Sequence, residues 1–145
     1  MARLDERTCR DRVRAARVGR LATADAGGAP HIVPVTFAVI GGPVGTELVS
    51  AIDHKPKSTA ALRRLRNLAA NPRAALLVDH YGEDWTRLWW VRADGHVVVD
   101  QHGPAWAVAI DALVEKYRQY ADRRPDGPVI RLRVERWSGW AYQDG

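Results

Sequence analysis

Residues 18–40 read VGRLATADAGGAPHIVPVTFAVI, which contains two β-rich segments separated by a glycine-containing turn. Residues 18–23 predict a strand, and residues 25–28, Asp-Ala-Gly-Gly, have the composition of a turn. Residues 30–40 are rich in β-branched side chains, which favour strands. Together the three segments predict a β-hairpin.

The rest of the chain continues this succession of short segments and turns. Four further strands are expected at residues 47–52, 74–81, 88–100 and from 130 onward, the third with a bulge at Gly95. Three helices are expected at residues 3–17, 58–70 and 104–121. Tight turns between adjacent strands favour antiparallel pairing. About six mostly antiparallel strands with three helices predict a mainly β fold, a small closed barrel in a single domain of residues 1–145.

The composition excludes several classes of protein. With 145 residues, 46% of them hydrophobic and 27% charged, the chain can bury one core and is not a disordered segment. Its single cysteine, Cys9, excludes an intrachain disulfide and a cysteine-based zinc site. Residues 1–20 carry seven arginines and no apolar block, and the longest apolar run, residues 32–40, is too short to span a membrane. We therefore expect a cytoplasmic protein.

Motifs for several kinds of chemistry are absent. The chain has no Gly-x-Ser-x-Gly elbow, no Gly-x-Gly-x-x-Gly fingerprint and no Walker loop. The five histidines lack metal-ligand spacing, so no metal site is expected. Asp79 and His80 are adjacent on a strand and point to opposite faces, which argues against a catalytic dyad.

Basic residues gather where a helix is expected to begin. The net charge of +5 favours anionic partners. Lys57 precedes a helix that opens at Ser58, and Arg63, Arg64 and Arg66 follow. A helix N-terminus presents free N–H groups and a partial positive charge, so this place is predicted to bind a phosphorylated ligand. The alternative is a solvated basic helix face.

Tryptophans form a second unusual group. Trp85, Trp89 and Trp90 lie within six residues. Trp89 and Trp90 face opposite ways on a strand, so one can fill the core while the other needs a partner subunit or a planar ligand. The alternative is that both pack. Trp137 and Trp140, beside Gly139, form a similar cluster, for which core packing is the simpler interpretation.

The ordered set of motifs resembles a known superfamily. VGRLATAD (residues 18–25) and GAPHIVPVTF (residues 28–37) resemble the opening hairpin of the pyridoxamine-phosphate-oxidase-like split barrels. Four later motifs are similar to its deazaflavin-dependent branch, which uses coenzyme F420: KPKS (55–58), LRRLRNL (62–68), NPR (71–73) and DWTRLWWVR (84–92). The resemblance runs from about residue 4 to residue 140.

This resemblance implies a split β-barrel homodimer with two cofactor sites at the subunit interface, and hydride transfer between coenzyme F420 and an organic acceptor. The backbone beside the deazaflavin ring would be that of Val33, Pro34, Val35 and Thr36. The residues near the ribityl chain would be Ser50, Ala51, Ile52 and Asp53. The phosphate would be held by Lys57, with Lys55 close by and Arg63 in the basic groove. The pocket wall from the other subunit would be formed by Trp85, Arg87 and Trp89.

Departures from the family's patterns decide between cofactors. Flavin-mononucleotide (FMN) members usually carry phosphate-binding arginines where this chain has Val33 and Pro56. This favours F420 and leaves FMN as the alternative. The substrate-phosphate segment of true pyridoxamine phosphate oxidases is missing after Trp140, so oxidation of a vitamin B6 phosphate is not expected. His80 and Tyr81 are candidate proton donors.

Two other functions stay open at this point. A non-enzymatic carrier of flavin, deazaflavin or haem could use the same barrel, because a fold does not determine a function. Nucleic acid is not expected as a partner, because no nucleic-acid-binding motif accompanies the basic charge.

Overall fold

The computed structural model describes residues 2–42, 45–52 and 59–143, and this part of the chain is mainly β, as predicted. Its strands are β1 (Ala2–Arg3), β2 (Gly19–Ala24), β3 (Pro30–Val35), β4 (Ala38–Gly42), β5 (Gly45–Ala51), β6 (Arg73–His80), β7 (Trp89–Asp100) and β8 (Val129–Ala141). Its helices are α1 (Glu6–Ala15), α2 (Thr59–Ala70), α3 (Pro104–Lys116) and α4 (Arg118–Asp122), with a 3₁₀ turn η1 (Trp85–Arg87).

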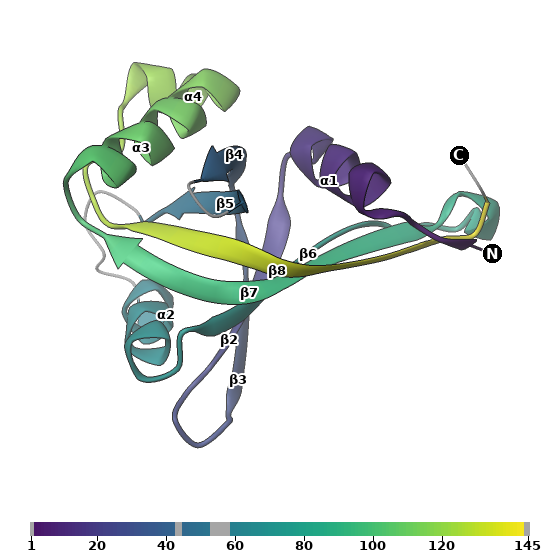
Figure 1. The fold of residues 1–145 in the computed structure, drawn as a ribbon, viewed down its shortest axis with the longest axis horizontal. Coiled ribbons are helices and arrows are strands. Elements are labelled where there is room, and N and C mark those ends of the chain that lie inside the picture. The colour runs from purple at the N-terminus through teal and green to yellow at the C-terminus, as the bar shows by residue number, and fades with distance from the viewer. Residues whose placement is uncertain (1, 43–44, 53–58, 144–145) are drawn as a thin grey trace.

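The strands form one antiparallel sheet that closes into a split barrel. Their order is β3-β2-β6-β7-β8-β5-β4, and β1 pairs with β8 beside this path (Figure 1). Only Thr36 and Phe37 separate β3 from β4. One continuous segment therefore pairs with β2 at one end of the order and with β5 at the other. The predicted split barrel is confirmed, although the described part has eight strands rather than six.

The first difference in strand count arises at Phe37, where the predicted strand of residues 30–40 is interrupted. The Phe37 N–H donates to the Tyr117 hydroxyl at 3.1 Å, and Lys116 Nζ donates to the Phe37 carbonyl at 2.8 Å. Side chains thus satisfy backbone groups that a strand ladder would otherwise use. Burial, followed by the charge of Arg17, lowers the pKa of Lys116 to about 8.

The same tyrosine explains a second difference, in the helices. The predicted helix of residues 104–121 is divided into α3 and α4 because Tyr117 between them is extended (φ −119°, ψ 120°). Tyr117 is buried, and its hydroxyl lies 2.8 Å from the Arg17 carbonyl as well as beside Phe37. Anchoring this side chain fixes α3 over β4 and β5, where Ile110 and Leu113 are buried.

The long hairpin of β7 and β8 has two parts, one in the barrel and one that projects from it as an arm (Figure 1). The predicted bulge at Gly95 is confirmed by a register shift between Asp94 and Gly95. A Cβ atom at Gly95 would lie 1.8 Å from the Arg133 carbonyl oxygen, so this position requires glycine. Strand β8 continues to Ala141, well past the predicted alternation, and β1 adds the short strand that was not predicted.

Helix α1 covers one face of the arm. Cys9 and Val13 are its buried residues, and a Cβ atom at Gly139 of β8 would lie 2.7 Å from the Cys9 Sγ atom. The Arg12 guanidinium carbon lies 4.9 Å from the centre of the Trp89 ring. Because Trp89 faces α1 and the core, its neighbour Trp90 faces the opposite side of the arm.

Candidate functional site

The predicted ring-binding segments meet at the junction of β3 and β5. The Ser50 hydroxyl donates to the Thr36 carbonyl at 2.7 Å, and the Thr36 hydroxyl lies 2.8 Å from the Tyr120 hydroxyl. Ile52 is buried, and its N–H donates to the Pro128 carbonyl at 2.8 Å. The structure therefore brings Thr36 and Ser50 into contact, although they lie 14 residues apart in the sequence.

Strand β3 presents its residues in alternation. Val33 and Val35 pack against the main core, whereas Ile32 is 65% exposed and Pro34 is also exposed. Strand β3 ends the sheet order, so its outer edge has no strand partner among the described residues. An open edge offers unpaired N–H and C=O groups to a ligand.

Helix α2 lies beside this edge and carries positive charge. The Asn67 Nδ2 atom donates to the Thr23 hydroxyl at 3.1 Å, and both side chains are buried, which fixes α2 on β2. His31 of β3 faces Arg63 and Arg64 of α2. Burial lowers the pKa of His31, and the charges of the two arginines lower it further. Its buried Nδ1 atom has no hydrogen-bond partner among the described residues, so a bound ligand could supply one.

The structure does not describe the turn that was predicted to carry the phosphate-binding lysines. Asp53, Lys55 and Lys57 lie outside the described residues, as does the expected helix cap at Ser58. Their roles stay predictions. Arg63 is exposed on α2.

The predicted wall residues lie at the other end of the molecule, on the arm. Arg87 and Trp89 line a cavity of about 320 Å³, together with Arg12 and His80. Trp85 is 71% exposed and does not line this cavity. Figure 1 places the start of β7 far from α2 and β3. Within one chain, the predicted wall residues on the arm are therefore far from the predicted ring-binding residues of β3.

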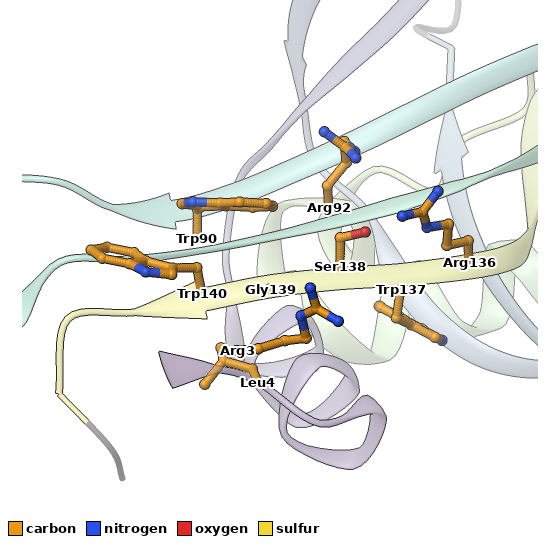
Figure 2. A pocket seen from close by; sticks show the side chains of 9 residues that line it. All are labelled: Arg3, Leu4, Trp90, Arg92, Arg136, Trp137, Ser138, Gly139 and Trp140. Carbon is orange, nitrogen blue, oxygen red and sulfur yellow. The ribbon is translucent and has the colours of Figure 1, made fainter. Parts of the chain in front are cut away.

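The opposite face of the arm holds a larger groove of about 480 Å³ (Figure 2). Its described lining consists of Arg3, Leu4, Trp90, Arg92, Arg136, Trp137, Ser138, Gly139 and Trp140. Core packing, the simpler interpretation for Trp137 and Trp140, holds for Trp137, whereas Trp140 lines the groove beside Trp90. Residues three apart on a strand face opposite sides, so the two cannot both face the core, and the bulge at Gly95 decides which one does. The alternation of Arg136, Ser138 and Trp140 was the available signal.

The described residues offer little for nucleophilic or metal chemistry. No group of three or more His, Cys, Asp or Glu side chains among them could hold a metal ion. Cys9 is buried, and burial raises the pKa of its thiol, which lowers its thiolate fraction. His80 lines the arm cavity, whereas Tyr81 is 61% exposed. None of the described helices is long and apolar enough to cross a membrane.

Solved structures share this fold at low sequence identity. A conserved hypothetical protein from Mycobacterium tuberculosis superposes with a TM-score of 0.74 at 23% identity, over 97% of this chain and 86% of that one. An FAD-binding protein from Mesorhizobium loti gives 0.72 at 23% identity over 95% of each chain. The haem storage protein HutZ from Vibrio cholerae gives 0.67 at 19% identity over 94% of each chain.

Sequence comparison identifies the family. No protein with a curated function matches the chain. The family model described as pyridoxamine 5'-phosphate oxidase matches residues 6–141, which include the barrel, both sides of the arm and every predicted site residue. This chain therefore belongs to the pyridoxamine 5'-phosphate oxidase family.

Proposed function

We propose that the protein is an F420-dependent oxidoreductase that transfers a hydride between coenzyme F420 and an organic acceptor. The observation that carries this proposal is the open edge of β3, which lies between the Thr36–Ser50 junction and the basic face of α2. An edge strand can hold a flat ring by its backbone, and the neighbouring cations can hold a phosphate and acidic tail.

Each part of the chain has a distinct task in this proposal. The backbone of residues 33–36 orients the ring, and residues 50–53 lie along the ribityl chain. Lys57 and Lys55 bind the phosphate. The unpartnered Nδ1 atom of His31 and the exposed Arg63 fit an anionic tail, because the charges of Arg63 and Arg64 act on this histidine. When bound, the deazaflavin supplies the hydride chemistry, so the protein needs only to bind, orient and exclude water.

The side chain of Val33 supports F420 over FMN. It packs against the core. At the same position, FMN-binding members of the superfamily that this chain resembles usually carry a phosphate-binding arginine. The strand therefore offers no cation there, and the phosphate depends on the turn that contains Lys57.

The proposal includes a homodimer. The arm residues Arg87 and Trp89 lie far from β3 in their own chain (Figure 1), and a second copy could bring its arm, with Trp85, over the β3 edge. His80 lies in the same arm cavity and could supply a proton to the acceptor.

A titration of the full chain with F420, FMN and FAD tests the proposal. Quenching of F420 fluorescence should give micromolar or tighter binding, and reduced F420 should be oxidised by at least one acceptor from a panel of enones, quinones and tetrapyrroles. Tight binding of FMN or FAD without F420 binding would refute the F420 assignment.

A cofactor carrier is the second candidate, favoured by the names of the structural relatives. One is an FAD-binding protein and another a haem storage protein, although at these identities they share only the fold. A bound, reduced cofactor that no acceptor in the panel oxidises would favour storage over catalysis.

A further inference from the structure

We propose that Tyr120 is a positioning residue of the candidate cofactor site, which acts on the bound ring through the hydroxyl of Thr36. This inference rests on the proposed function, in which residues 33–36 lie beside a flat redox ring. Tyr120 lies on α4, 84 residues beyond Thr36, and it is not among the residues predicted for the site. In the structure the two hydroxyl oxygens are 2.8 Å apart. The segment of α3 and α4 thereby adds a side chain that the strands of the site do not supply.

Packing holds the Tyr120 side chain in place. Its ring meets the Tyr117 ring edge-on, with the two ring centres 5.7 Å apart and an angle of 77° between the ring planes. Tyr117 is itself buried, and its hydroxyl is bonded to the backbone of Phe37 and of Arg17. Tyr120 also packs against the buried cluster under α3, to which Val49 belongs. Because the ring is already ordered by these contacts, its hydroxyl loses little entropy when it bonds to Thr36.

Other polar groups fix the backbone around Thr36. Its carbonyl accepts from the Ser50 hydroxyl at 2.7 Å. The N–H of the next residue, Phe37, donates to the Tyr117 hydroxyl, and the Phe37 carbonyl accepts from Lys116 Nζ at 2.8 Å. With the backbone held at these points, the rotation of the Thr36 side chain among its staggered rotamers is the freedom that remains. The contact with Tyr120 selects one of these rotamers.

The Thr36 hydroxyl keeps hydrogen-bonding capacity for a ligand. A threonine hydroxyl has one donor and two acceptor sites. If Tyr120 donates to it, Thr36 keeps its hydrogen for a carbonyl oxygen of the ring, and if Thr36 donates to Tyr120, its oxygen can still accept from a ring N–H. The pyrimidine part of a flavin or a deazaflavin carries both kinds of group. Thr36 is only partly buried, so a ligand can reach this hydroxyl in the orientation that Tyr120 fixes.

A double-mutant cycle on the full chain tests this role, with F420 dissociation constants measured by fluorescence quenching. Tyr120→Phe keeps the packed ring and removes only the hydroxyl, and Thr36→Val keeps the branched shape and removes the other hydroxyl. We expect each single variant to bind F420 about three- to tenfold more weakly, and the double variant to bind no more weakly than Thr36→Val alone. An unchanged dissociation constant in Tyr120→Phe, or losses that multiply in the double variant, would overturn the proposal.

Two further variants separate positioning from support of the fold. Thr36→Ser keeps the hydroxyl, so adding Tyr120→Phe to it should again weaken F420 binding about threefold or more. Tyr117→Phe is the matched control, because it removes a hydroxyl from the same ring pair, but one that is bonded to the backbone of Phe37 and Arg17. It should lower the urea midpoint more than Tyr120→Phe does, and its effect on F420 binding should be the same with or without Thr36→Val. If Tyr117→Phe lost its effect together with the Thr36 hydroxyl, as Tyr120→Phe should, the specific role of Tyr120 would be refuted.

Failure of this inference and failure of the proposed function give different results. If the parent chain binds F420 but the cycle shows no coupling, the F420 assignment stands and the role of Tyr120 is refuted. If the parent chain binds FMN instead of F420, the F420 assignment fails, and the same cycle measured with FMN decides the role of Tyr120, because FMN carries the same pyrimidine edge. Binding of neither F420 nor FMN by the parent chain would overturn both.

Discussion

The molecule carries two basic surfaces that are built in different ways. At the end of the barrel, the open backbone edge of β3 lies beside the cations of α2. On the arm, side chains from three strands converge on one sheet face, where β8 pairs with β7 along its length and with β1 at Trp140 and Ala141. The first surface can hold a ring by main-chain contacts, whereas the second presents indole and guanidinium side chains.

This difference determines how each surface responds to substitution. Main-chain recognition tolerates changes of side chain, so only the cations and the strand junction should matter at the barrel end. The arm depends on register, because a one-residue slip would move Trp90 to the opposite face. The bulge at Gly95 sets that register and connects the two regions.

The largest effect is expected from Gly95→Ala, which should disturb both surfaces at once. The new Cβ atom would lie 1.8 Å from the Arg133 carbonyl oxygen, and backbone cannot move aside as a flexible side chain can. We expect the free energy of unfolding in urea to fall by about 2–4 kcal/mol. Gly41→Ala is the control, because a Cβ atom there meets nothing within 4 Å. Equal stability of the two variants would show that the bulge does not constrain the hairpin.

Lys57→Ala should separate the two surfaces. Loss of a charged hydrogen-bond donor should weaken F420 binding by about 1–3 kcal/mol. Arg14→Ala removes an equal charge from an exposed position on α1, which contains none of the residues assigned to F420, and should leave the F420 dissociation constant within a factor of about two. An unchanged dissociation constant in Lys57→Ala would show that this lysine does not contact the phosphate.

The sequence predicted what local pattern controls. β-Branched runs, turn glycines and the amphipathic spacing of Ile110 and Leu113 identified the barrel, the hairpin and the helix over its end. It missed the break at Phe37 because that break depends on Tyr117, a residue 80 positions later. A long-range hydrogen bond leaves no local pattern, so residues 30–40 were predicted as one strand.

For the same reason, some residues of the candidate sites were predicted correctly and others were missed. Thr36 and Ser50 do meet, because the pairing of Ala38 with Val49 in the β4–β5 hairpin brings Ser50 next to the segment just before β4. The opposite orientation of Trp89 and Trp90 was also predicted and is confirmed, since strand alternation is local. Arg3 and Arg136 were missed, because only the pairing of β1 with β8 and the bulge bring them onto the face of Trp90.

A smaller effect is expected from Ser50→Ala at the barrel end. The variant removes the donor to the Thr36 carbonyl, and Ser50 is buried, so water replaces the hydrogen bond poorly. The free energy of unfolding should fall by about 1 kcal/mol. Ser138→Ala, a partly exposed position on the arm, should change it by less than about 0.5 kcal/mol. Equal losses at the two positions would contradict a special role for the junction.

The smallest effect, a pH dependence, should appear at only one of the two surfaces. Burial and the charges of Arg63 and Arg64 lower the pKa of His31, and an anion bound beside it would raise that pKa again. Binding would then take up a proton, so the affinity for F420 should rise as the pH falls from 7.5 to 5.5, by about threefold. Carboxylates with an ordinary pKa near 4.3 stay mostly ionised over this range, so the ligand contributes little. The dependence should disappear in His31→Gln.

The described lining of the arm groove contains arginine as its only titratable residue type, so that surface should keep its charge over the same range. An F420 affinity that did not change with pH in the parent chain would show that His31 does not contact the bound anion.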